Sequence, residues 1–222
     1  MSHSKISARF IEPMLLHRAE RLPEGGLWIY ELKLDGFRAE AIKSAGRVHL
    51  RSRSDKDFNT RYPAIVQALA PMPEDTVIDG EIVAVDESGR PSFSALQNYG
   101  SSTRLLYYVF DVMILAGKDV MTEPLTARRE MLQEHVLTNL GESIRESQQF
   151  EAGLPELIHS VKSQALEGLV AKRRESRYEP GQRSGAWQKM RVNRAQEFVI
   201  GGYTGAPRTS TRLCSATTTP RS

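Results

Sequence analysis

The chain has 222 residues, of which 40% are hydrophobic and 26% charged, a composition typical of a folded globular protein with one or two domains. It carries 30 Lys and Arg against 27 Asp and Glu, and its single cysteine, Cys214, cannot form an internal disulfide. These values exclude a disordered chain, a collagen-like fibre and a disulfide-rich scaffold. Without a long apolar run or an apolar leader, they favour a protein with no membrane association in a reducing compartment such as the bacterial cytoplasm.

Strands dominate the predicted elements. Residues 27–33 are rich in aromatic and branched side chains, and the β-prone runs 39–43 and 47–51 flank Ser44-Ala45-Gly46, a plausible hairpin turn. The further predicted strands are 76–85, 105–112, 168–172, 186–192 and 196–201. Apolar periodicity and composition predict helices at 62–70, 92–98, 124–139 and 154–166. Because strands and helices do not alternate regularly, we expect an α+β fold with mainly antiparallel sheets flanked by helices.

Charge and composition vary along the chain. Residues 172–194 contain eight basic and two acidic residues, whereas residues 74–87 contain six acids and no base. Such polarity suits a polyanion on one surface and cations on another, although two solvated faces are the alternative. Residues 203–222 contain nine Ser or Thr and no acid. We therefore predict a folded domain over residues 1–202, followed by a disordered or loosely packed tail.

The sharpest motif is Lys33-Leu34-Asp35-Gly36-Phe37-Arg38. In an extended segment alternate side chains share a face, so Glu31, Lys33 and Asp35 point the same way. Gly36 then permits a turn or a close approach of the backbone to a ligand. A lysine amine attacks an electrophile only after losing its proton, so a site built on Lys33 must either lower the pKa of that amine or remove its proton during the reaction. A surface ion pair beside a glycine turn is the alternative.

The motif resembles the K-x-D-G-x-R sequence of the covalent nucleotidyltransferases, which include ATP-dependent DNA ligases, RNA ligases and mRNA capping enzymes. The resemblance is strongest to the ligase domain of bacterial end-joining DNA ligases, and it extends from about Pro13 to Gly202. Further matching segments follow in the family's order: Arg51-Ser52-Arg53, Asp79-Gly80-Glu81, Tyr108-Val109-Phe110-Asp111, Glu167-Gly168-Leu169-Val170-Ala171-Lys172, Ser176-Arg177-Tyr178-Glu179-Pro180-Gly181 and Trp187-Gln188-Lys189-Met190-Arg191. The resemblance implies an ATP-grasp-like adenylation domain.

The resemblance also implies a role for particular side chains. Lys33 would be the catalytic nucleophile, and Phe110 would stack on adenine, whereas composition alone makes Phe110 a core residue. Glu81 and Glu167 would bind Mg²⁺ or Mn²⁺. The implied nucleotide contacts are Glu31, Arg38, Arg53, Glu81, Phe110, Lys172, Lys189 and Arg191. Arg191 stands where the family usually has lysine, which changes the geometry of any phosphate contact.

The implied function is ATP-dependent ligation of DNA. Lys33 would take AMP from ATP, AMP would pass to the 5′-phosphate of nicked DNA, and the 3′-hydroxyl would seal the strand. The implied partners are nicked or broken double-stranded DNA and other end-joining repair proteins. Ligases of this family continue past the equivalent of Gly202 into an OB-type domain, where this chain enters its Ser/Thr-rich tail. An RNA ligase or capping-type enzyme, and a catalytically silent nucleotide-binding remnant, are the alternatives.

Overall fold

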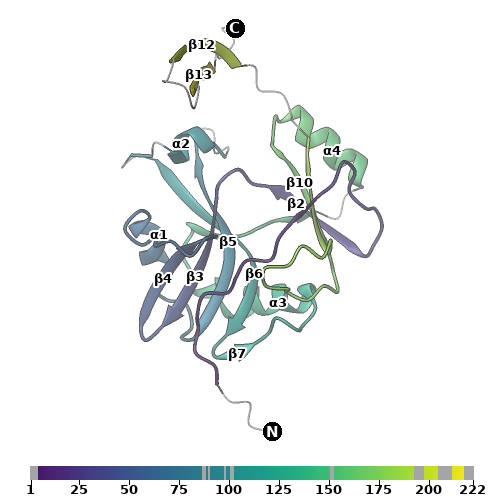
Figure 1. Cartoon of the computed structure of the whole chain (residues 1–222). Coiled ribbons are helices and arrows are strands. Elements are labelled where there is room, and N and C mark those ends of the chain that lie inside the picture. The colour runs from purple at the N-terminus through teal and green to yellow at the C-terminus, as the bar shows by residue number, and fades with distance from the viewer. Residues whose placement is uncertain are drawn as a thin grey trace. The chain divides into compact units, whose positions relative to one another are not determined.

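The computed structural model describes residues 5–86, 89, 91–97, 99–100, 103–150 and 153–192, and the backbone of the strands 198–204 and 212–217. The chain divides into two compact units, Met1–Val192 and Asn193–Ser222. In the first unit, strands form the framework and short helices flank them (Figure 1). No described helix has the length and apolar content needed to cross a membrane.

A six-stranded sheet forms one half of the first unit, with the order β4-β3-β5-β6-β7 and β8 beside β6. Its members are β3 (Phe37–Ser44), β4 (Arg47–Ser52), β5 (Thr76–Val85), β6 (Arg104–Leu115), β7 (Lys118–Asp119) and β8 (Ile144–Glu146). All pairs are antiparallel except β6 with β8. The predicted hairpin joins β3 to β4, and Ala45 and Gly46 both have positive φ, 48° and 74°, as a tight two-residue hairpin turn requires.

A five-stranded sheet forms the other half, with the order β1-β11-β10-β2-β9. Its members are β1 (His17–Arg18), β2 (Trp28–Lys33), β9 (Gln149–Phe150), β10 (Gly168–Arg173) and β11 (Trp187–Arg191). Only β1 with β11 is a parallel pair. The predicted α+β fold with mainly antiparallel sheets is therefore confirmed. The chain leaves this sheet at Lys33 and enters the six-stranded sheet at Phe37.

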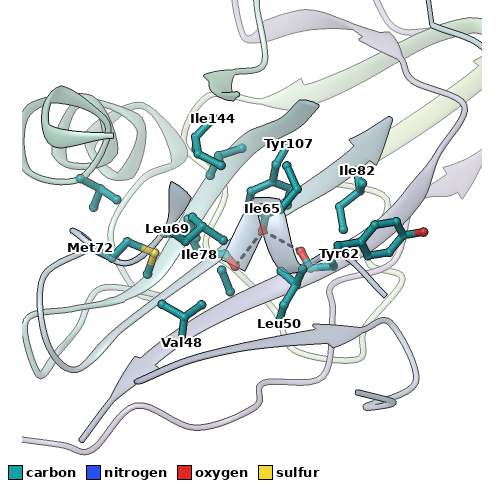
Figure 2. Packing of buried hydrophobic residues seen from close by; sticks show 14 of the residues in the cluster. Val48, Leu50, Tyr62, Ile65, Leu69, Met72, Ile78, Ile82, Tyr107 and Ile144 are labelled. Atoms are coloured by element: carbon teal, nitrogen blue, oxygen red, sulfur yellow. Dashed lines mark hydrogen bonds between the residues drawn. The ribbon is translucent and has the colours of Figure 1, made fainter. Parts of the chain in front are cut away.

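The main core packs around the six-stranded sheet (Figure 2). Tyr107 of β6 is fully buried there, and its hydroxyl donates a hydrogen bond to the carbonyl of Ala39 at 2.8 Å. Ile65 of α1 is also fully buried. The helices are α1 (Pro63–Ala68), α2 (Phe93–Gln97), α3 (Leu125–His135), the 3₁₀ turn η1 (Leu137–Asn139) and α4 (Leu154–Ser163).

Helix α3 has a polar side that the sequence did not predict to be buried. Its apolar face carries Leu125 and Leu132, but Arg128 and Arg129 are buried as well. The guanidinium of Arg128 donates two hydrogen bonds of 2.7 Å to the carboxylate of Asp111 on β6. These arginines link the helix to the sheet through ion pairs, so its buried surface is wider than the apolar stripe indicates.

The second unit contains a two-stranded antiparallel sheet, β12 (Phe198–Thr204) with β13 (Arg212–Thr217). Strand β13 lies within the segment for which the sequence predicts a tail, and residues 205–211 and 218–222 lie outside the described residues. The predicted boundary at residue 202 stays a prediction.

Candidate active site

Lys33 lies where two open cavities meet. Six side chains that line only the first cavity form what we call the aromatic pocket: Glu31, Phe110, Ser147, Val170, Lys172 and Trp187. Five cations that line only the second cavity form what we call the basic groove: Arg53, Lys56, Arg61, Arg183 and Lys189. Leu16, Lys33, Arg38 and Glu81 line both cavities. A base-sized apolar space and a cationic surface therefore adjoin one lysine amine.

The Lys33 amine is paired with Glu167, which directly precedes β10. Lys33 Nζ donates to Glu167 Oε2 at 2.7 Å, and Arg191 Nε donates to Glu167 Oε1 at 3.0 Å. The strand register explains this chain of contacts, because Gly168 pairs with Lys33 on β2 and with Arg191 on β11. The side chain of Arg191 is 62% exposed and lines neither cavity, whereas those of Lys33 and Glu167 are each 16% exposed.

Two glycines permit the close packing around Lys33. A Cβ atom on Gly36 would lie 2.2 Å from the carbonyl oxygen of Ile82, and one on Gly168 would lie 2.0 Å from that of Met190. Any side chain at either position would therefore displace a neighbouring strand. The sequence predicts a turn at Gly36 or an approach of its backbone to a ligand, whereas the close approach found in the structure is to strand β5.

Glu31 organises the aromatic pocket. Its buried carboxylate accepts hydrogen bonds from Lys172 Nζ at 2.9 Å, Arg129 Nη1 at 3.1 Å and Ser147 Oγ at 3.0 Å. Lys172 Nζ also lies over the rings of Phe110 and Trp187, 4.2 and 4.4 Å from their centroids. Burial lowers the pKa of Lys172, and the neighbouring Glu31 carboxylate opposes that shift.

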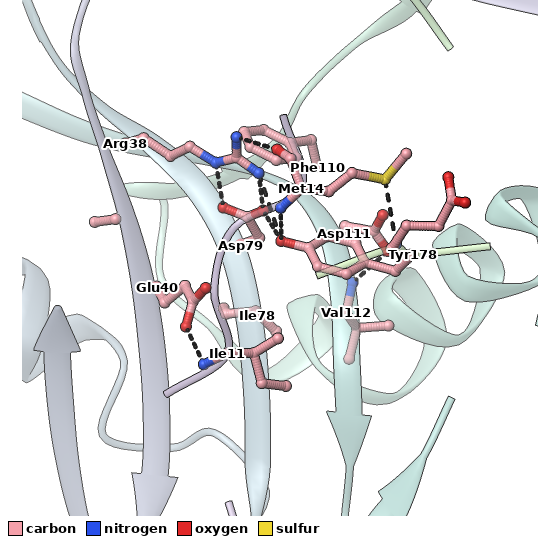
Figure 3. Close-up of polar contacts among 12 residues, drawn as sticks. Ile11, Met14, Arg38, Glu40, Ile78, Asp79, Phe110, Asp111, Val112 and Tyr178 are labelled. Carbon is pink, nitrogen blue, oxygen red and sulfur yellow. Dashed lines mark hydrogen bonds and ion pairs between the residues drawn. The ribbon is translucent and has the colours of Figure 1, made fainter. Parts of the chain in front are cut away.

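Arg38, which lines the pocket, is held by a network of hydrogen bonds (Figure 3). Its guanidinium donates to Asp79 Oδ1 at 3.0 Å and Oδ2 at 2.6 Å, and to the Met14 carbonyl at 2.6 Å. The Tyr178 hydroxyl donates to Asp79 Oδ2 at 2.7 Å. The guanidinium carbon lies 5.5 Å from the centroid of Phe110. Arg38 thus positions the aromatic ring while adding positive charge beside Lys33.

Glu81 of β5 lies at the junction of the two cavities. Burial, with the charges of Asp79 and Glu167, raises its pKa to about 8 against the opposing effects of Lys33 and Arg38. A cation beside this carboxyl would favour its ionised form, so Glu81 suits a metal ion. No group of three or more His, Cys, Asp or Glu in the described part of the chain could ligate one. A divalent ion there would need water and phosphate oxygens to complete its coordination.

The cations of the basic groove come from segments in both halves of the first unit. Arg53, Lys56 and Arg61 follow the hairpin strands, whereas Arg183 precedes β11 and Lys189 lies on it. Partial burial lowers the pKa of Lys189, and the charges of Lys33, Arg191, Arg183 and Arg53 lower it further. Such mutual repulsion favours an anionic ligand that would relieve it.

Sequence reasoning missed several residues of the site. Trp187 and Arg183 stand in or beside a matched segment, and Asp79 within another, so proximity to a motif could have indicated them. Arg129 and Ser147 offer no such signal, because their shared partner Glu31 is 98 and 116 positions away. Of the predicted residues, the cavities bring together Glu31, Lys33, Arg38, Arg53, Glu81, Phe110, Lys172 and Lys189.

Comparisons with known proteins show the family to which the chain is similar. The model of the ATP dependent DNA ligase domain matches residues 13–191. The chain is 37% identical over 177 residues to the multifunctional non-homologous end joining protein LigD of Mycolicibacterium smegmatis. This alignment covers 79% of this chain and 23% of that protein. The chain is also 37% identical over 199 residues to the LigD of Pseudomonas aeruginosa, in an alignment that covers 88% of this chain and 24% of that protein. It therefore spans about a quarter of the length of these curated relatives.

A solved structure gives the same result at the level of the fold. The chain superimposes on the mycobacterial DNA ligase D complexed with ATP and MES with a TM-score of 0.70 and 34% identity, over 87% of this chain and 64% of that one.

Proposed function

The chain belongs to the family of ATP-dependent DNA ligase domains, and from this premise we propose that it is the adenylation domain of a DNA ligase, with Lys33 as its nucleophile. The observation that carries the proposal is the position of Lys33 Nζ between the aromatic pocket and the basic groove. The pocket suits a purine base and the groove suits phosphates, so the α-phosphate of a bound ATP lies between them, near the amine.

In the first step, the lone pair of Lys33 Nζ forms a bond to the α-phosphorus of ATP. The bond from that phosphorus to the bridging oxygen breaks, and pyrophosphate leaves with the electron pair. Glu167 Oε2, 2.7 Å from Nζ, is placed to take the proton that the amine must lose. Arg53 and Lys189 supply positive charge for the leaving phosphates. The product is a phosphoramidate between Lys33 and AMP.

Glu81 and Glu167 are the residues that would hold Mg²⁺ or Mn²⁺. Such an ion, when bound, neutralises phosphate charge beside the nucleophile. Glu81 supports this role because its carboxyl lies at the junction of the cavities with a raised pKa. Glu167 would give up part of its contact with Lys33 to do so, while Arg191 holds its second oxygen.

The later steps use DNA as substrate. AMP passes from Lys33 to the 5′-phosphate at a nick, and the 3′-hydroxyl then attacks that phosphate and releases AMP. The basic groove, which adjoins Lys33, is the surface that would hold the DNA phosphates. The relatives are end-joining proteins by name, and a role in joining broken ends together with other repair proteins is part of the same proposal.

Intact-mass spectrometry after incubation with ATP and Mg²⁺ tests the first step. We expect wild-type protein to gain the mass of one adenylyl group, and Lys33→Ala to gain none because it lacks the amine. Lys162→Ala, which removes an exposed lysine of α4, is the matched control and should form the adduct normally.

The remaining outcomes separate the alternatives. Wild-type protein without an adduct, even with an added OB domain from a related ligase, would contradict the proposal and favour a silent nucleotide-binding remnant. Transfer of AMP to nicked RNA in preference to nicked DNA would identify an RNA-directed enzyme instead.

A further inference from the structure

Ser147 lines the aromatic pocket but not the basic groove. The four residues shared by both cavities mark the side on which phosphates would lie, so Ser147 belongs to the side that would receive the edge of a base. It stands in the connection between β8 and β9, among Glu31, Phe110 and Trp187. No segment quoted in the sequence analysis includes it.

The Ser147 hydroxyl is held in one orientation. The backbone amide of Ser147 donates to the Val109 carbonyl at 2.8 Å, and its own carbonyl accepts a hydrogen bond from Arg129 Nη2. Its side chain is buried, and Oγ donates to Glu31 Oε2 at 3.0 Å. Contacts on the amide, the carbonyl and the hydroxyl therefore fix the direction in which the oxygen points.

Because the hydroxyl of Ser147 donates its proton to Glu31, its oxygen can act towards a ligand only as a hydrogen-bond acceptor. A serine hydroxyl has one proton and two lone pairs, and the proton of Ser147 is directed at a carboxylate. Across the ranges that the structure describes, no other residue donates to Ser147 Oγ, so its lone pairs stay open to a ligand. It can accept a hydrogen bond from an amino group but has no proton left for a carbonyl.

The neighbouring cations are already engaged in part by other groups. Lys172 directs one proton at Glu31, and its ammonium lies over the rings of Phe110 and Trp187. Arg129 donates to Glu31 and to the carbonyls of Phe110 and Ser147. A base edge bearing a carbonyl beside Ser147 would thus leave two acceptors facing each other, which is unfavourable when both are buried.

We propose that Ser147 is a specificity-determining residue, whose Oγ accepts a hydrogen bond from the exocyclic 6-amino group of adenine and thereby disfavours 6-keto purines. The inference rests on the proposed function, because it requires a nucleotide base in the aromatic pocket.

The inference is tested by measuring the binding of three nucleoside monophosphates by calorimetry. Because a monophosphate has no pyrophosphate to release, none of the three can react with Lys33. AMP carries the 6-amino group, inosine monophosphate a 6-keto group, and purine riboside monophosphate only hydrogen. We expect Ser147→Ala to weaken AMP binding about 3- to 10-fold, as loss of one hydrogen bond does, with purine riboside monophosphate binding unchanged. The preference for ATP over ITP in adduct formation should fall by a similar factor.

Two further variants serve as controls. Ser147→Thr keeps the hydroxyl and should keep the discrimination. Ser163→Ala removes an exposed hydroxyl that donates to the Ser160 carbonyl at 3.0 Å, and should change nothing. A thermal melt of each variant establishes that it is folded.

Each remaining outcome overturns the inference. If Ser147→Ala weakens AMP and purine riboside monophosphate equally, the residue only supports Glu31. If AMP binding and the ATP preference do not change, Ser147 does not contact the base. Normal adduct formation in those two cases would leave the proposed function intact, whereas wild-type protein with neither nucleotide binding nor an adduct would overturn both.

Discussion

Three buried carboxylates of the first unit each have an arginine partner. Glu31 pairs with Arg129, and Asp111 pairs with Arg128. Asp79 pairs with Arg38 in the same way. Because a buried ion pair gains stability only when its remaining lone pairs are also satisfied, these networks favour one arrangement of the pocket wall.

Glu40 on β3 differs from these carboxylates (Figure 3). It is fully buried, its Oε2 accepts the Ile11 amide at 3.1 Å, and its Oε1 has no partner. Burial, followed by the charge of Asp79, raises its pKa to about 9 against the opposing effects of the Ile11 amide and Arg38. Glu40 is therefore neutral at pH 7, directly behind the network that holds Arg38.

We expect Glu40→Gln to make folding less sensitive to alkaline pH. The native state holds the Glu40 proton up to about pH 9, whereas the unfolded chain releases it near 4.5. The stability that this proton provides is full below pH 4.5, declines as the pH rises and is lost above about 9. We therefore expect the difference in free energy of unfolding, variant minus wild type, to increase with pH across this window by at most about 1.4 kcal/mol per pH unit, measured in denaturant. A constant difference would show that Glu40 is ionised in the folded protein; Glu130→Gln, on the exposed side of α3, is the control.

At the level of elements, β10 is the strand on which the site depends. It pairs with β2, which carries Lys33, and with β11, which carries Lys189 and Arg191. Gly168 begins β10 and lies against the backbone of Met190 and Arg191. Strand spacing at this point sets the geometry of the contact between Lys33 and Glu167.

Gly168→Ala should damage both stability and catalysis. The added Cβ would lie 2.0 Å from the Met190 carbonyl oxygen, so β11 must move away from β10. Overpacking of this kind costs about 1–3 kcal/mol, which chemical denaturation measures. The rate of adduct formation should fall as well, since Glu167 shifts relative to Lys33. Gly141→Ala, where no atom lies within 4 Å of the new Cβ, is the matched control. Normal stability together with a normal rate would contradict this account.

Local sequence predicted most elements but not the contacts between them. The predicted strand 76–85 has the same bounds in the structure, because its β-branched run is long and ends at a clear turn. The predicted helix 124–139 ends at His135, and a 3₁₀ turn follows. The strands β1, β7, β8 and β9, of two or three residues each, are too short for an alternating pattern, and tertiary pairing alone forms them.

The same limit applies to the candidate site. Lys33, Glu81 and Phe110 could be found because each lies in a contiguous matched segment. The hydrogen bonds from Arg38 to Asp79 and to the Met14 carbonyl could not be found in this way. They depend on how an N-terminal segment crosses the sheet.

At the level of the whole molecule, the placement of charge matters more than its sum. The net charge of the chain is only +3, yet six cations besides Lys33 line the second cavity, the five of the basic groove and Arg38, and Glu81 is the one acid that lines it among the described residues. Long-range attraction of a polyanion therefore depends on this local cluster.

Removing groove cations should weaken the binding of nicked DNA in a salt-dependent way. We expect Lys56→Gln and Arg183→Gln each to lower the slope of log affinity against log salt by about 1 if each side chain contacts one phosphate. Fluorescence anisotropy at several salt concentrations measures the slope. Lys118→Gln removes the same charge from exposed strand β7 and should leave it unchanged. Equal effects of all three variants would show that only net charge matters and that the groove is not the contact surface.

The link between the two sheets has a mechanical consequence. Residues 34–36 alone join β2 to β3, so Glu31 and Lys33 belong to one sheet, while Arg38 and Glu81 belong to the other. A change in the angle between the sheets would separate these two sets of side chains. A nucleotide bound across the seam would contact both sheets, so its fit would report on the spacing between them.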